Sequence, residues 1–244
     1  ALDDAKTLGV LDAVNYDSKT FPRDHMVAMS YTALSRPTKA GDNMLLDTLI
    51  QQGSVNKSKA SATKLRFENS RMYAKMRAQE QGTARAYVLT ATVSAPSGES
   101  LTYTGKAQTE GQDLSAELRY EDALMVGIYQ KNGVQYQYID GKTIKLDKTN
   151  LAEIPVSAIS EASEKNGTYA FSLIPAVLNK TIQGISLKQV DYSVKTDGDT
   201  IGRQTARIQV NMPVGGKTQT YKIEVRAERT GVSGTIEIPN GMEI

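Results

Sequence analysis

The alternation of apolar and polar residues in the larger, C-terminal part of the chain constrains the fold more than any other feature. The strictest example is QTYKIEVRAE at 219–228, where Tyr221, Ile223, Val225 and Ala227 alternate with charged residues. Successive side chains of a strand point to opposite faces, so this segment predicts a strand with one covered face and one wet face. Similar segments recur from YVLTATVSA (87–95) onward, which predicts an antiparallel sheet.

Short turn sequences separate these segments. Asn132-Gly133 is the favoured pair for a two-residue type I′ hairpin turn, and it predicts that Tyr129 lies opposite Tyr136. Further turns are expected at Asp140-Gly141, Asp197-Gly198 and Gly215-Gly216. A final strand is expected in SGTIEIP (233–239).

Residues 149–184 differ from the segments around them. Their alternation is weak, and Pro155, Gly167 and Pro175 interrupt them. We therefore expect a helical or irregular insertion between two groups of strands.

The expected fold class is α+β, with two domains. Residues 63–244 are expected to form an antiparallel curved sheet, a half-barrel, preceded by a helix over 63–81. A sheet with one apolar face must cover that face, and helices packed into its concave side are the natural solution. Residues 1–62 are expected to form a small module of three short helices, with Pro22 at a helix start and Gly9 and Gly53 at helix ends.

Composition excludes several classes of function. The chain has 244 residues and a net charge of +2, which argues against a dedicated nucleic-acid binder. It has no cysteine, hence no disulfide framework, and no apolar run long enough for a transmembrane helix. Ala1 falls within an expected helix and no signal peptide precedes it, so we expect a mature or truncated form of an exported protein.

The sequence gives little support to catalysis. His25 is the single histidine, and neither a G-x-S-x-G motif nor a phosphate-binding glycine loop is present. A zinc site built from one histidine and carboxylates would be unusual, so we expect no metal and no cofactor. We expect a protein that is not an enzyme. A glycosidase would need two buried carboxylates, and the pattern singles out no such pair.

Two groups of residues are candidates for contact with a ligand. Tyrosine combines an apolar ring with a polar tip, which suits a lipid or glycan pocket, but cross-strand pairing within the sheet explains the same residues. The apolar segment FSLIPAVLNKTI (171–182) is either a lid over an apolar ligand or part of the core. The candidates are Tyr120, Tyr129, Tyr136 and Tyr138 in the strands, and Phe171, Ile174 and Leu178 in the insertion.

The N-terminal segment AKTLGVLDAVNYDSKTFPRDHMVAMSYTAL resembles the second half of an S-layer homology (SLH) repeat. That family binds a negatively charged secondary cell-wall polymer, partly through an arginine that Arg23 matches here. Pro22 and His25 depart from the family motif, and one partial copy is present instead of the usual three. The resemblance implies a location on a Gram-positive-type cell envelope, with Arg23 as a polymer contact.

The remainder resembles the LolA/LppX/LprG-like lipoprotein fold. The matching segments are GIYQKNGVQYQYIDGKTIKLD, LIPAVLNKTI and GVSGTIEIPNGMEI, in an order of helix, strands, insertion and strands. The resemblance implies a half-barrel covered by helices, and a lipid or lipidated ligand held between them. Members anchored through a lipobox cysteine differ from this chain, which has none.

These observations lead to a non-enzymatic, extracellular protein of the cell envelope that binds an apolar or amphipathic ligand. The alternative is a structural or cell-wall attachment protein with a filled core. Small inward-facing residues that leave apolar space would favour the first hypothesis, and a close-packed interior would favour the second.

Overall fold

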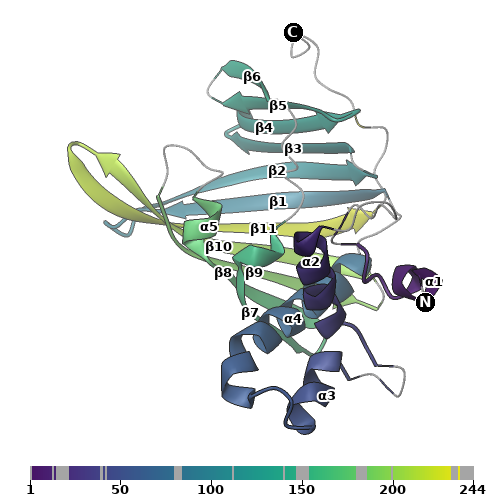
Figure 1. Cartoon of the computed structure of the whole chain (residues 1–244). Coiled ribbons are helices and arrows are strands. Elements are labelled where there is room, and N and C mark those ends of the chain that lie inside the picture. Colours follow the sequence, from purple (N-terminus) through teal and green to yellow (C-terminus); the bar gives the residue numbers. More distant parts are fainter. Residues whose placement is uncertain are drawn as a thin grey trace. The chain divides into compact units, whose positions relative to one another are not determined.

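The computed structural model describes residues 2–12, 14, 22–38, 41, 43–79, 84–111, 113–139, 141–146, 154–179, 186–198, 200–231 and 236. The chain divides into two compact units, Ala1–Glu68 and Asn69–Ile244, whose boundary falls within one long helix (Figure 1). No helix in these described ranges is both long enough and apolar enough to cross a membrane.

The first unit is helical. It contains α1 (Leu2–Thr7), α2 (Arg23–Leu34), α3 (Leu45–Gln51) and the first half of α4 (Lys57–Ala78). The three helices expected between residues 1 and 62 are thus present, and α4 begins earlier than the expected residue 63. Their small core consists of Met44, Leu46, Ala60 and Phe67, and the ring of Tyr31 packs edge-on against Phe67 at 5.0 Å.

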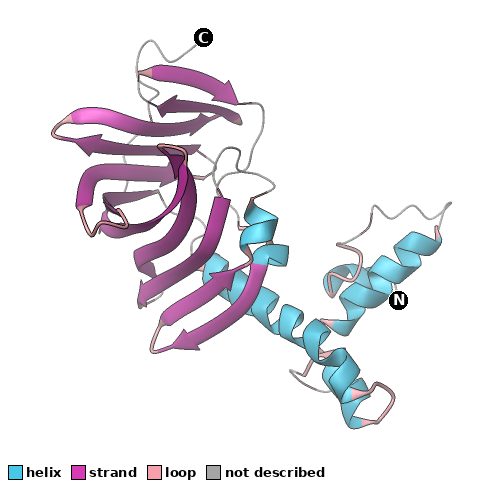
Figure 2. Cartoon of the chain, turned by 90° about the vertical axis from the view of Figure 1, so that its left-hand side faces the viewer, coloured by secondary structure: helices cyan, strands magenta, loops and turns pink. Residues whose placement is uncertain are grey.

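The second unit is a single antiparallel sheet of 11 strands, in the order β6-β5-β4-β3-β2-β1-β11-β10-β9-β8-β7. Figure 2 shows that this sheet is strongly curved, and it stays open because β6 and β7 are its two edges. The predicted curved antiparallel sheet with helices is confirmed. The strands are β1 (Arg85–Ser94), β2 (Ser100–Glu110), β3 (Asp113–Tyr120), β4 (Ala123–Lys131), β5 (Val134–Ile139), β6 (Lys142–Leu146), β7 (Ile159–Lys165), β8 (Thr168–Leu173), β9 (Ser186–Asp197), β10 (Thr200–Val214) and β11 (Lys217–Gly231).

Local turn chemistry sets the register of the hairpins. Asn132 and Gly133 both have positive φ, as a type I′ turn requires, and Tyr129 pairs with Tyr136 as expected. The turn residues Gly198, Gly215 and Gly216 also have positive φ between paired strands.

The helices of this unit define the two faces of the sheet. Residues paired directly across antiparallel strands share a face, and one such row runs through Phe171, Tyr192, Ala206, Val225 and Ala91. Tyr73 and Met76 of α4 pack in the core cluster that contains Phe171. We call this helix-bearing side the inner face and the opposite side the outer face.

The helical insertion expected over 149–184 is corrected. Within the described part of this range, β7 and β8 form a hairpin, flanked by the short η1 (Val156–Ala158) and α5 (Pro175–Leu178). The hairpin turns at Asn166-Gly167, both with positive φ, and β8 buries Tyr169, Phe171 and Leu173 in alternation. The strand expected over 233–239 lies outside the described residues except for Ile236, which is buried.

Candidate ligand-binding surfaces

The inner face is mainly apolar over β1–β4 and mixed over β5 and β6, where Gln135, Gln137 and Lys142 share it. Its side chains are buried over β1 and partly open to solvent from β3 onward. Leu118, Val126 and Ile128 belong to this face by their cross-strand pairing, and each is half-buried. Ile139 and Ile144, further along the same paired rows, are each 48% exposed. Side chains of this kind, gathered on one face, are typical of a surface that binds an apolar partner.

Small residues occupy the centre of this face. Ala91, Ala107 and Ala116 lie in the adjacent strands β1, β2 and β3; Ala91 and Ala107 are buried, and Ala116 is half-buried. Gly105 lies among them, and a Cβ there would overlap the backbone carbonyl of Glu117 in β3. The close approach of β2 and β3 therefore requires glycine at this position.

The two halves of the inner face are packed differently. Over β7–β10, Tyr73, Met76 and Leu178 from helices pack with the strand residues. Over β1–β3, the cluster around Tyr87 and Leu89 comes from strands alone among the described residues. Both clusters are buried, and the partly exposed apolar side chains of β3–β6 are the candidate binding surface.

The structure places four of the seven predicted ligand residues at three locations. Tyr120 is on the inner face at the end of β3, with its ring 5.8 Å from that of Tyr103. Phe171 is 2% exposed, between Tyr73 at 5.6 Å and Tyr192 at 6.3 Å, and Leu178 packs against the same cluster. Ile174, which precedes α5, is 37% exposed.

The other three tyrosines lie on the outer face, so the structure does not bring the seven residues together. Tyr129, Tyr136 and Tyr138 form a separate cluster with Leu124 and Val134. Tyr129 is 0% exposed, and a Cβ on Gly127 would lie 2.7 Å from its ring. Glycine at 127 thus makes room for this ring.

A buried carboxylate anchors the outer tyrosine cluster. The Tyr129 hydroxyl donates to Glu117 Oε1 at 2.9 Å, and Arg119 Nη2 donates to Glu117 Oε2 at 3.0 Å. Burial, followed by the bond to Glu117, raises the pKa of the Tyr129 phenol far above its ordinary value. Glu117 and Arg119 are two residues apart in β3 and therefore lie on the same face of the strand. This spacing is the signal by which the sequence could have indicated the cluster.

We expect Tyr129→Phe to make the protein less sensitive to alkaline pH. A phenol whose pKa is raised by folding stabilises the protein below its unfolded pKa, and this stabilisation is lost as pH rises beyond about 10. The variant should have a shallower fall in unfolding free energy above that pH, measured by urea denaturation across a pH series. Tyr103→Phe, which removes a hydroxyl from the inner face, is the control. If the unfolding free energy falls equally steeply with pH in the unmodified protein and in both variants, the pKa of Tyr129 is not raised by folding.

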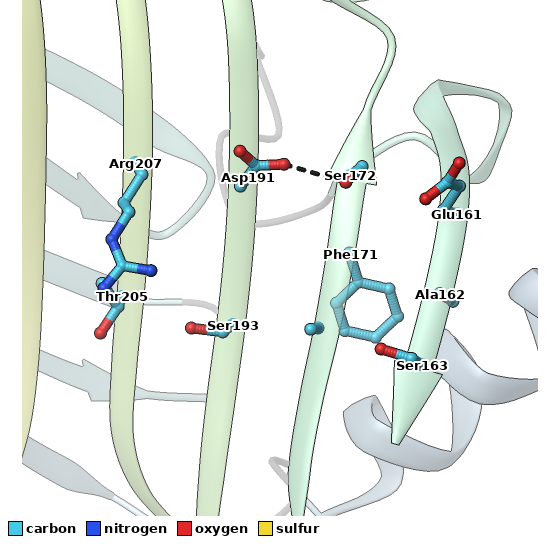
Figure 3. Close-up of a pocket in the computed structure, with 10 residues that line it drawn as sticks. Glu161, Ala162, Ser163, Phe171, Ser172, Asp191, Ser193, Thr205 and Arg207 are labelled. Carbon is cyan, nitrogen blue, oxygen red and sulfur yellow. Dashed lines mark hydrogen bonds between the residues drawn. The ribbon is translucent and has the colours of Figure 1, made fainter. Parts of the chain in front are cut away.

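A polar pocket of about 320 Å³ lies on the outer face across β7–β10 (Figure 3). Ser172 donates a 2.9 Å hydrogen bond to Asp191, which also accepts a 2.6 Å bond from Gln189. Arg207, on the other side, is held by Glu224 at 2.7 Å, and this pairing lowers the pKa of the Glu224 carboxyl. A neighbouring hollow of about 420 Å³ shares Asp191 and Arg207 with it. The polar side chains of this pocket hydrogen-bond to one another, as is common on the solvent-facing surface of a sheet.

Arg23 is exposed in the first turn of α2. Within the described ranges, no three histidine or carboxylate side chains lie close enough together to hold a metal ion.

Comparisons with known proteins add structural likenesses only. No family model matches the chain, and no curated protein matches it. Among solved structures, the lipoprotein LppX of Mycobacterium tuberculosis is 8% identical at a TM-score of 0.36, covering 70% of this chain and 99% of its own. A LolA superfamily protein from Nitrosomonas europaea is 9% identical at a TM-score of 0.32, covering 66% of this chain and 94% of its own. LprF from Mycobacterium bovis is 11% identical at a TM-score of 0.29, covering 70% of this chain and 95% of its own.

These solved structures are LolA/LppX-like, as the resemblance of residues 63–244 led us to expect. None of the comparisons matches the N-terminal segment to an S-layer homology repeat. With TM-scores below 0.5, they say nothing about the function of this chain.

Proposed function

We propose that the second unit binds the acyl chain of a lipid, or another amphipathic molecule, on the inner face of β1–β6. The observation that carries this proposal is the row of partly exposed apolar side chains of that face over β3–β6, beside the small residues Ala116 and Gly105. The row consists of Leu118, Val126, Ile128, Ile139 and Ile144. Burial of a methylene contributes roughly 0.8 kcal/mol before ordering costs, so a chain lying along this face has an adequate driving force.

The proposal gives the predicted residues different roles. Tyr120 and Tyr103 lie at the end of the candidate binding surface, where a phenol can meet the polar end of the ligand. Phe171 and Leu178 belong to the packed half and support the sheet beside the ligand. Tyr129, Tyr136 and Tyr138, on the outer face, receive no ligand contact in this proposal.

The location of the protein is part of the proposal. A carrier or receptor of lipid acts where lipid is present, and a location at the cell envelope is also what the sequence resemblances imply. Attachment to a cell-wall polymer through Arg23 stays a prediction of the sequence.

The first experiment is solvent extraction of natively purified protein, followed by mass spectrometry of the extract. We expect an amphipathic molecule in stoichiometric amount, or its uptake after incubation with total membrane lipid. A blank extract after both treatments would favour the structural alternative.

A space-filling variant tests where the ligand lies. Ala116→Phe should weaken binding of a fluorescent fatty acid at least about tenfold, because the ring fills the centre of the inner face. Thr104→Phe adds a similar ring on the outer face of the neighbouring strand and should leave the affinity unchanged. Affinity of the unmodified protein should also rise with acyl length, by up to about fourfold per methylene. Equal affinities in both variants would place the ligand elsewhere.

A further inference from the structure

The helix α4 concentrates the positive charge of the chain. It carries seven basic residues and one acidic residue in Lys57–Ala78. The whole chain has 29 basic and 27 acidic residues, so the remainder has 22 against 26 and is net negative. The basic residues are Lys57, Lys59, Lys64, Arg66, Arg71, Lys75 and Arg77.

The first three turns of α4 present these charges in two rows. At 3.6 residues per turn, Lys57 and Lys64 lie on one side of the helix, and Lys59 and Arg66 lie on the other. Between the rows is an exposed strip of small side chains that ends at Leu65, which is 47% exposed. The strip consists of Ser58, Ser61, Ala62 and Leu65. We call these two rows and the strip the Lys57–Arg66 surface.

Three of its four cations have no ion-pair partner among the described residues. Lys64 is paired with Asp47 at 2.6 Å and with Glu68 at 3.6 Å. Lys57, Lys59 and Arg66 are exposed, and no described carboxylate lies within ion-pair distance of them.

The start of α4 departs from ordinary helix design. A helix N-terminus carries partial positive charge and favours Asp or Glu in its first turn, yet this first turn contains Lys57 and Lys59 and no acidic residue. Asn56 does cap the helix, since its Oδ1 accepts from the backbone N–H groups of Ser58 at 3.0 Å and Lys59 at 3.2 Å. The two lysines add to the positive potential of the helix end, and an anion outside the chain would relieve the resulting repulsion.

We propose that the Lys57–Arg66 surface docks on the anionic headgroups of a lipid bilayer. The cations provide long-range attraction to a negative membrane, and their stems extend along the strip while the charges stay at the headgroups. Leu65 is an apolar side chain facing solvent between the two rows, and the acyl boundary of a bilayer is a favourable place for it. The choice of a membrane as the source of anions rests on the proposed function, since that is where an acyl ligand would be collected or delivered.

Sedimentation of the full chain with vesicles tests the proposal. We expect strong partitioning onto vesicles of phosphatidylcholine and phosphatidylglycerol in equal parts, weak partitioning onto phosphatidylcholine alone, and loss of binding at high ionic strength. The combined variant Lys57→Gln, Lys59→Gln, Arg66→Gln should partition about a hundredfold less, at about fivefold per cation.

A matched control removes three exposed lysines of the second unit, as Lys188→Gln, Lys195→Gln, Lys222→Gln, and should partition far more strongly than the α4 variant. Equal losses in the two variants would show a general charge effect and overturn the proposal. So would equal binding to neutral and anionic vesicles.

Leu65→Ser distinguishes a membrane from a water-soluble polyanion. It should weaken binding to anionic vesicles severalfold and leave binding to inorganic polyphosphate unchanged. If vesicle binding is unaffected and polyphosphate competes for it fully, a soluble polyanion is the partner and the membrane proposal is overturned. Fatty-acid titration without vesicles reports on the ligand site alone, so failure of either proposal can be recognised separately.

Discussion

The variant Val194→Asp is expected to be unfolded at room temperature. Val194 of β9 is 0% exposed, and it pairs with Tyr169 of β8 and Gln204 of β10. The change loses the free energy of burying valine, about 1.5–3 kcal/mol. It also adds the cost of burying a carboxylate charge or, if the carboxylate becomes neutral, the cost of protonating it. The sum approaches the total stability of a typical domain, about 5–15 kcal/mol.

Circular dichroism and urea denaturation measure this effect. Lys195→Asp introduces the same side chain at the next residue, on the exposed outer face, and should keep the unfolding midpoint near that of the unmodified protein. A folded Val194→Asp protein with an unchanged midpoint would mean that β9 faces the opposite way.

The second large effect is expected from Gly105→Ala. A methyl group at 105 would overlap the carbonyl of Glu117, which is backbone and cannot rotate away as a flexible side chain could. Separation of β2 from β3 should then lower the unfolding free energy by about 3 kcal/mol, at the upper end of the overpacking range.

Gly202→Ala is the matched control. It is also a strand glycine without positive φ, and a Cβ there would have its nearest neighbour at 3.5 Å, an ordinary contact. We expect its melting temperature to be almost unchanged. Equal melting temperatures for the two variants would show that β2 and β3 do not approach so closely at Gly105.

The hairpin in the expected insertion shows where sequence interpretation failed. Pro155 and Pro175 suggested interrupted helices, and both lie at the ends of the hairpin, outside its strands. Asn166-Gly167 is the same kind of turn as Asn132-Gly133, and TYAFSL alternates as strictly as the predicted strands. The local signals for two strands are therefore present in the sequence, and the prolines mark the ends of the hairpin and do not interrupt helices.

The ligand site was predicted less well than the strands. Asn132-Gly133 correctly paired Tyr129 with Tyr136, but pairing across a hairpin tells only that two residues share a face. Whether that face meets helices or solvent depends on segments far apart in the chain, here Tyr73 and Met76 of α4 against β8 and β9. Four tyrosines in neighbouring strands thus divide between the two faces.

The sequence by itself determined the features that arise from neighbouring residues: the period of two in Tyr221–Ala227, the glycine turns, and the helices before the sheet. These depend on backbone preferences and on the alternation of side chains, which act over a few residues. Only the tertiary structure decided that β1 pairs with β11, which joins the two groups of strands into one open sheet. It also decided that helices fill one half of the inner face, because burial of an apolar surface depends on what the rest of the chain brings to it.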